Sequence, residues 1–156
     1  MAALDFPTSP TNGQQYTAAG HAWIYNTAAT SWVSSSNAAV RSIGYVIDGG
    51  AAVPATGVWG QISIPIACTI TGWILTGDAS GSCVVDVLRS TYSAFPTTTS
   101  IAGTDKPTLS TAQKNQNLAI SAWGSVALAA GDQVQFNLNS VTTIKRIAIT
   151  LMVTIP

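Results

Sequence analysis

The sequence predicts an all-β protein, a jelly-roll-like β-sandwich preceded by a small N-terminal β-hairpin module. Helical patterns are nearly absent, and Thr, Ser, Val, Ile and Gly divide the chain into short segments, as in β domains with frequent turns. Two segments, residues 133–139 and 144–154, place large apolar side chains at alternate positions. With 156 residues, 47% of them hydrophobic, the chain is long enough to build one core.

We expect two parts, residues 1–38 and residues 39–156. In the first part, Pro7 and Pro10 favour an extended approach, and Asn12-Gly13 favours a turn. The candidate strands that follow are Gln14–Thr17, His21–Asn26 and Ser31–Ser34. This first part is predicted to be a docking module.

The N-terminal module carries three aromatic residues that are its docking candidates. With residues 27–30 as the hairpin loop, Tyr25 faces Trp32 across the strand pair, and Trp23 shares the face of Tyr25. Such rings also stack on sugars in glycan-binding proteins. A hairpin too short to bury a core needs them for packing against a neighbour, which is the favoured interpretation. The polar segment 34–39 predicts a linker behind the module.

The second part contains the candidate strands of the sandwich. They are Ser42–Ile47, Trp59–Ile64, Cys68–Leu75, Cys83–Arg89, Asn117–Ile120, Ser125–Leu128, Gln133–Asn139 and Ile144–Thr154. Residues 77–81 read Gly-Asp-Ala-Ser-Gly, which predicts a hairpin turn between two of these strands.

Both faces of that predicted hairpin are apolar. Trp73 would face Val85 and Thr71 would face Val87, with further apolar pairs on the other side. Because an antiparallel pair in a lone sandwich usually has one wet face, the second apolar face predicts burial against a second partner, either another subunit or a covering loop. Trp73, Val85 and Val87 are therefore interface candidates, and we expect a homo-oligomer, namely a trimer.

The same register bears on Cys68 and Cys83. It separates them by about 23 Å at the rise of a strand. A disulfide needs Cα atoms within about 7 Å of each other. We therefore expect two free, buried thiols that act as small apolar residues.

Charge is sparse throughout the chain. Charged residues make up 8% of it, there is no Glu, and the formal net charge is zero. The clustered cations that nucleic-acid binding requires are missing. Residues 1–7 lack the pattern of a signal peptide, and the apolar stretch 147–155 is far shorter than the ~20 residues of a membrane helix. We expect no nucleic-acid partner, no membrane insertion and synthesis in a cytoplasm without an export signal.

Residue types that carry catalysis do not form a recognisable pattern. Asp78 falls in the predicted turn and Asp86 on a strand expected to be solvated, so turn and surface roles are favoured over paired catalysis. His21 has no carboxylate or Cys at metal-ligand spacing. There is no Gly-x-Ser-x-Gly motif, and neither Cys has a cationic neighbour in sequence. We expect no enzymatic activity, no cofactor and no metal.

Two sets of segments resemble modules of tailed-phage virion proteins. The N-terminal set, similar to a short module of tail fibres and other appendage proteins, consists of residues 6–17 (FPTSPTNGQQYT), 23–26 (WIYN) and Trp32. The C-terminal set, similar to the terminal β-domain of such proteins, consists of residues 106–110 (KPTLS), 119–123 (AISAW), 130–132 (AGD), 136–137 (FN) and 144–153. The resemblance implies a virion surface protein, commonly a homotrimer.

Three functions are compatible with these features. The first is a phage tail-fibre or appendage attachment module, in which the hairpin docks to other virion proteins and the sandwich faces outward, towards a host surface glycan. The second is a capsid decoration (cement) protein that stabilises the head. The third is a glycan-binding lectin module. The expected location is the virion, whereas the lectin alternative would be secreted or displayed on a particle.

Overall fold

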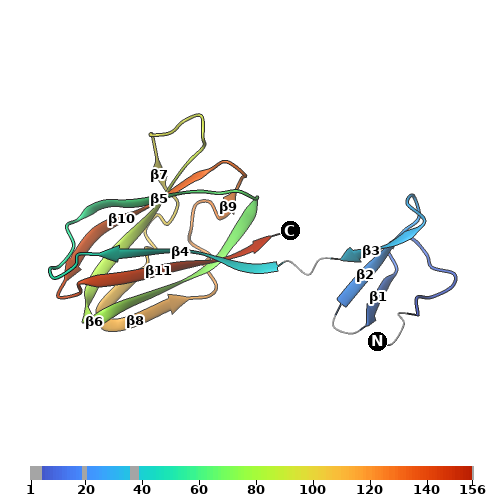
Figure 1. The fold of residues 1–156 in the computed structure, drawn as a ribbon, viewed down its shortest axis with the longest axis horizontal. Coiled ribbons are helices and arrows are strands. Elements are labelled where there is room, and N and C mark those ends of the chain that lie inside the picture. The colour runs from blue at the N-terminus through green and yellow to red at the C-terminus, as the bar shows by residue number, and fades with distance from the viewer. Residues whose placement is uncertain (1–4, 19–20, 36–38, 156) are drawn as a thin grey trace. The chain divides into compact units, whose positions relative to one another are not determined.

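The computed structural model describes residues 5–18, 21–35 and 39–155. They form two compact units, one of residues up to Ala39 and one of Val40–Ile155 (Figure 1). The described residues contain no helix, and the prediction of an all-β fold with a β-sandwich is confirmed. The strands are β1 (Gln15–Ala18), β2 (His21–Asn26), β3 (Ser31–Ser35), β4 (Ala39–Asp48), β5 (Gly57–Ser63), β6 (Cys68–Ser90), β7 (Thr99–Ser100), β8 (Thr108–Asn117), β9 (Ala127–Leu128), β10 (Gln133–Thr142) and β11 (Arg146–Ile155).

The N-terminal unit is a three-stranded antiparallel sheet in the order β1-β2-β3. Residues 27–30 form the predicted loop between β2 and β3, and the Asn26 side chain accepts two backbone N–H groups of that loop at 2.9 and 3.2 Å. The predicted turn at Asn12-Gly13 also forms. Gly13 has a φ of 79°, which favours glycine, and donates its N–H to the Tyr25 carbonyl at 2.9 Å.

One face of this small sheet is covered by aromatic rings. Tyr25 lies opposite Trp32 with ring centroids 5.5 Å apart, as predicted, and Tyr16 lies opposite Trp23 at 5.9 Å. Phe6, from the segment before β1, stacks on Trp32 at 5.3 Å and also contacts Tyr16 and Trp23. These five rings, the aromatic cluster, give the unit a small apolar centre that its short strands alone cannot supply.

The second unit is an antiparallel sheet that curls on itself around the long strand β6. Its main path runs β4-β11-β6-β10-β5, while β7, β8 and β9 pair with the other edge of β6. Strand β11 pairs with the first half of β6 and β10 with the second half. The curl brings β4 back towards the far end of the sheet, where Tyr45 lies over Gly60 of β5 and stacks on Phe136 of β10 at 5.7 Å.

The predicted hairpin at residues 77–81 is wrong. Strand β6 continues through this segment for 23 residues without reversing, and residues 77–81 mark its passage from β11 to β10. A Cβ on Gly81 would lie 2.4 Å from the Thr143 hydroxyl and 2.5 Å from the Thr142 carbonyl oxygen. Glycine is needed here because the β10–β11 connection approaches the strand closely. In the sequence, a glycine required for close approach looks the same as a glycine required for a turn.

The interface candidates of that hairpin are therefore corrected. Trp73 pairs with Leu151 and Val85 pairs with Leu138, so Trp73 and Val85 do not face each other. Trp73, Val85 and Val87 are 3%, 0% and 0% exposed and belong to the core. A continuous strand that bends in this way directs alternate residues of both halves into one core, which leaves these three unavailable to a partner.

Both cysteines are free and buried, which confirms the prediction, although they are kept apart by the length of β6 and not by a hairpin register. Burial raises the pKa of both thiols. The Asp132 carboxylate raises the pKa of Cys68 further, whereas a backbone hydrogen bond with Leu109 opposes the rise at Cys83.

The alternating segments form strands β10 and β11, as predicted. Their buried hydrophobic residues are Val134, Phe136, Leu138, Ile147, Ile149, Leu151 and Val153. The strand predicted at Asn117–Ile120 is wrong, because the chain leaves the sheet after Asn117 and the strand is β8. Of the residues of β8, only Leu109 is buried. Its polar sequence carries no hydrophobic alternation, and its place is set by backbone pairing with β6.

Candidate functional site

A cavity of about 510 Å³ lies where β6 ends and the β6–β7 loop begins; this loop projects from the body of the sandwich (Figure 1). Its volume is within the range of small-molecule sites, roughly 300–1,000 Å³. The lining residues are Arg89, Ser90, Thr91, Ala94, Thr97, Thr99, Ser100, Ile101, Gly124 and Ser125. Six of these ten residues carry a hydroxyl group, so we call the site the hydroxyl cavity.

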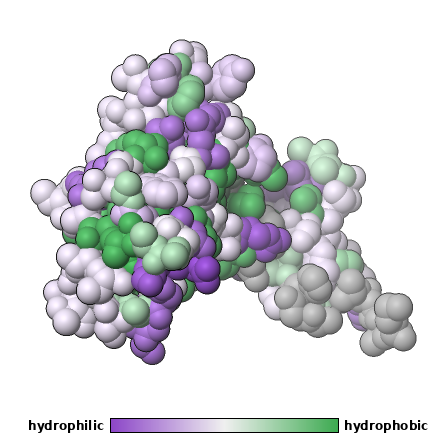
Figure 2. All heavy atoms as spheres, turned by 60° about the vertical axis from the view of Figure 1, so that its left-hand side comes forward, coloured by the Kyte–Doolittle hydropathy of each residue, from purple (hydrophilic) through white to green (hydrophobic). Residues whose placement is uncertain are grey.

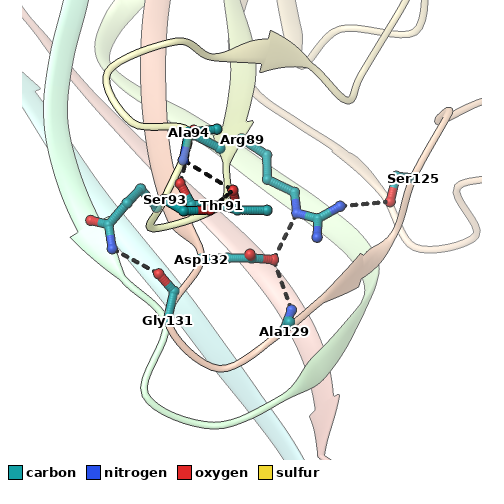
Figure 3. Close-up of polar contacts among 10 residues, drawn as sticks. Arg89, Thr91, Ser93, Ala94, Ser125, Ala129, Gly131 and Asp132 are labelled. Atoms are coloured by element: carbon teal, nitrogen blue, oxygen red, sulfur yellow. Dashed lines mark hydrogen bonds and ion pairs between the residues drawn. The ribbon is translucent and has the colours of Figure 1, made fainter.

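Arg89 is the charged residue of this lining, and Asp132 fixes its position (Figure 3). The Arg89 Nε donates to Asp132 Oδ2 at 2.7 Å, and Nη1 donates to the Ser125 hydroxyl at 3.4 Å. Asp132 is 3% exposed, and the same oxygen accepts the Ala129 N–H at 2.8 Å. A buried carboxylate requires such partners, and the two opposite charges offset each other at the cavity wall.

The β6–β7 loop is closed on itself by Thr91. Its carbonyl oxygen accepts the N–H groups of Ala94 and Phe95 at 3.2 and 3.1 Å. Its hydroxyl also accepts the Ala94 N–H at 3.2 Å and lies 3.2 Å from the Ser93 hydroxyl (Figure 3). These bonds define the shape of the loop and so of one wall of the cavity.

Two threonines of the lining have free hydroxyl groups. Within the described parts of the chain, neither Thr97 nor Thr99 has a side-chain hydrogen bond to a protein group. Tyr92, on the same loop, is 80% exposed. This wall therefore offers donors and acceptors that a bound molecule can use.

The hydroxyl of Ser100, in contrast, is already engaged. It donates to Asp86 Oδ1 at 2.6 Å, and Asp86 also pairs with Lys106 at 3.2 Å. Asp86 is buried, so the expectation of a solvated strand position is wrong. The Ser100 hydroxyl and the Lys106 ammonium compensate the carboxylate for the loss of water.

Asp78 and Asp86 do not form a catalytic pair in this fold. Asp78 is exposed and its carboxylate accepts the N–H groups of Arg146 and Lys145 at 3.2 and 3.0 Å. These hydrogen bonds, that of Arg146 first, hold the pKa of Asp78 below its usual range. The hydrogen bond from the Gly50 N–H, followed by that from the Arg146 side chain, does the same for the pKa of Asp48.

No metal site and no spanning helix are found in residues 5–18, 21–35 and 39–155. This part of the chain contains no group of three His, Cys, Asp or Glu side chains that could hold a metal ion. Nor does it contain a helix of the length and apolar character needed to cross a membrane. The side chain of His21 lies outside the described residues.

Several large apolar side chains are exposed on or beside the two strands that end the path of the curled sheet, β4 and β5. The exposed ones on β4, on β5 and in the loops that adjoin β5 are Val40, Val46, Val53, Val58 and Ile66. Figure 2 shows green hydrophobic patches on the surface, among pale residues and several purple hydrophilic groups. A groove of about 460 Å³ between β4 and the end of β5 has an apolar lining that includes Ile43, Ile62 and Val153. We call the five exposed residues, Val40, Val46, Val53, Val58 and Ile66, the β4–β5 apolar surface.

The structure brings together Trp23, Tyr25 and Trp32 of the predicted site residues. Sequence reasoning missed Phe6 and Tyr16 of the aromatic cluster, although Tyr16 precedes β2 in an alternating segment. It also missed the hydroxyl cavity. The one signal in the local sequence is Arg89, a lone charged residue at the end of an apolar strand. Its partner Asp132 lies 43 positions further along the chain, so the local sequence does not reveal their pairing.

No protein-family model matches the chain, and no significant similarity connects it to a curated protein or to a solved structure.

Proposed function

We propose that this protein is a non-enzymatic structural protein of a phage virion surface, acting as a tail-fibre or appendage attachment module. The observation that carries the proposal is the division of the chain into two units with different features. A small unit held by an aromatic cluster precedes a sandwich that has a hydroxyl cavity and a projecting loop at one end. The small unit suits docking to a particle, and the cavity suits recognition outside it.

In this proposal the N-terminal unit joins the chain to other virion proteins. Its aromatic rings are only half-buried within the unit. Half-buried Trp and Tyr side chains are enriched where proteins meet, because they bring a large apolar area with a polar group. Trp23, Tyr25 and Trp32 remain docking candidates for that reason.

A homotrimer remains part of the proposal, on a new basis. The β4–β5 apolar surface replaces Trp73, Val85 and Val87 as the contact region, because its residues are exposed and the others are not. Light scattering on the purified protein is expected to give about three times the chain mass of 16.0 kDa. A stable monomer at micromolar concentration contradicts the trimer.

The same surface favours a second candidate, a decoration protein whose copies clamp capsid subunits. Exposed apolar strands at the limits of a sheet suit lateral contacts with neighbouring virion proteins. In this case the particle loses stability when the protein is removed, and the hydroxyl cavity has no role.

Particle incorporation tests the proposed function. The full chain, or a variant lacking residues 1–38, is expressed while phage particles that do not encode this protein themselves are assembling. The particles are then purified and assayed for the protein by mass spectrometry. We expect the full chain in the particle and the truncated chain outside it. Absence of the full chain contradicts a virion role. Labelled particles viewed by electron microscopy distinguish tail from head.

A further inference from the structure

We propose that the hydroxyl cavity binds a neutral carbohydrate, with Thr97 and Thr99 as its principal hydrogen-bonding side chains. This inference rests on the proposed attachment function, since it assigns the class of surface molecule that the sandwich recognises. It places the binding site in the second unit and not on the aromatic rings of the first.

The charge of the cavity selects a neutral ligand. Arg89 is the cationic residue of the lining, and its guanidinium is paired at 2.7 Å with Asp132. An anionic ligand therefore meets no uncompensated positive charge, and a cationic ligand meets no free carboxylate. The paired guanidinium still has N–H groups that can donate to a neutral hydroxyl oxygen.

The chemistry of the walls matches a sugar ring. Thr97 and Thr99 present hydroxyl groups that no protein group satisfies, and such groups both donate and accept. Ala94 and Ile101 add short apolar surfaces beside them. A sugar has the same alternation of hydroxyl edges and apolar C–H faces, whereas a purely apolar ligand leaves the threonine hydroxyls without partners.

The site is also preorganised. Asp132 and Ser125 hold the Arg89 side chain, and the hydrogen bonds of Thr91 hold the loop that carries Thr97. A wall that is fixed before binding reduces the ordering cost of association, which matters for a small polar ligand.

Saturation-transfer NMR with the full-length protein tests the proposal. The probes are methyl α-glucoside, methyl β-galactoside and N-acetylglucosamine as neutral sugars, and N-acetylneuraminic acid as an acidic one. We expect at least one neutral sugar to bind more tightly than the acidic sugar. The double variant Thr97→Val and Thr99→Val keeps the shape of both side chains and removes the hydroxyls. Its affinity is expected to fall about tenfold or more, as for two lost hydrogen bonds.

Thr69→Val is the matched control, because Thr69 is an exposed strand residue outside the cavity lining. It is expected to leave sugar binding unchanged. Arg89 is not used as a test position, since its removal leaves the buried Asp132 carboxylate without its ion-pair partner. Three results overturn the inference: no neutral sugar of the panel binds, the acidic sugar binds most tightly, or the double variant keeps full affinity while folded. Particle incorporation is measured separately, so a failure here leaves the virion role standing.

Discussion

The two units of this chain are held together by different means. In the described part of the N-terminal unit no side chain reaches full burial, and its centre is a set of half-buried rings with centroids 5.1–5.9 Å apart. The sandwich has a continuous core to which nearly every strand contributes, including Phe136, Leu138 and Ile149. The difference shows that a short segment can reach a defined structure by ring contacts, while independent stability requires apolar side chains buried on several strands.

The largest effect is expected at the centre of the sandwich. Phe136→Ala removes a fully buried ring that stacks on Tyr45, and should lower the free energy of unfolding by about 3–5 kcal/mol. Denaturant unfolding followed by far-UV circular dichroism measures it. Tyr92→Ala, at a position that is 80% exposed and outside the β4–β5 apolar surface, is the control and should change stability by less than about 0.5 kcal/mol. Equal effects at both positions contradict the described core.

A smaller effect is expected at the corner of β6. Gly81→Ala places a methyl group against Thr142, Thr143 and the buried Ile144, and should cost about 1–3 kcal/mol. Gly124→Ala is the control, since nothing lies within 4 Å of the added carbon. The free energies of unfolding of both variants are compared by denaturant titration. If Gly81→Ala is as stable as the control, the close approach of the β10–β11 connection is refuted.

In the N-terminal unit, Trp32→Ala should disrupt the aromatic cluster without affecting the sandwich. It removes the stacking on Phe6 and the contact with Tyr25, worth on the order of 1 kcal/mol beyond the buried area. Near-UV circular dichroism and limited proteolysis of the first 38 residues report on the unit. Val33→Ala, on the opposite face of β3, should leave both signals unchanged. The same loss in both variants excludes a role for the rings. We also expect Trp32→Ala to weaken particle incorporation.

A modest pH dependence is expected from Asp78. Its pKa in the folded state is below the ordinary 3.8, so its stabilising contribution is present above that pH and is lost as pH falls through the folded pKa. Asp78→Asn should therefore reduce the difference in stability between pH 7 and pH 3. Thermal unfolding of the wild type and the variant at both pH values measures this change. An undiminished difference assigns the acid sensitivity to other carboxylates.

The smallest effect is expected from removing the N-terminal unit altogether. The chain without residues 1–38 should fold and keep its thermal midpoint nearly unchanged, because the core of the second unit is formed by its own strands. Differential scanning calorimetry compares it with the full chain. If the truncated chain unfolds, the two units depend on each other for stability.

Local patterns in the sequence determined several features of this protein. Alternation identified β10 and β11, and the spacing of Tyr25 and Trp32 around a four-residue loop gave the correct register of β2 and β3. These features depend on side chains only a few positions apart, since the period of a strand is two residues. The prediction of two free, buried cysteines was also correct, although the hairpin register from which it was argued was wrong.

Other features were decided only by the tertiary structure. The segment 77–81 carries the residues of a turn, but whether glycine serves a reversal or a close approach depends on the β10–β11 connection some 60 positions away, as in the bond between Thr142 and Ser82. Strand β8 has no apolar alternation and exists because β6 offers it backbone partners. The pairing of Arg89 with Asp132 joins distant segments in the same way. Backbone pairing and burial are long-range, so they appear in the folded chain and not in its local sequence.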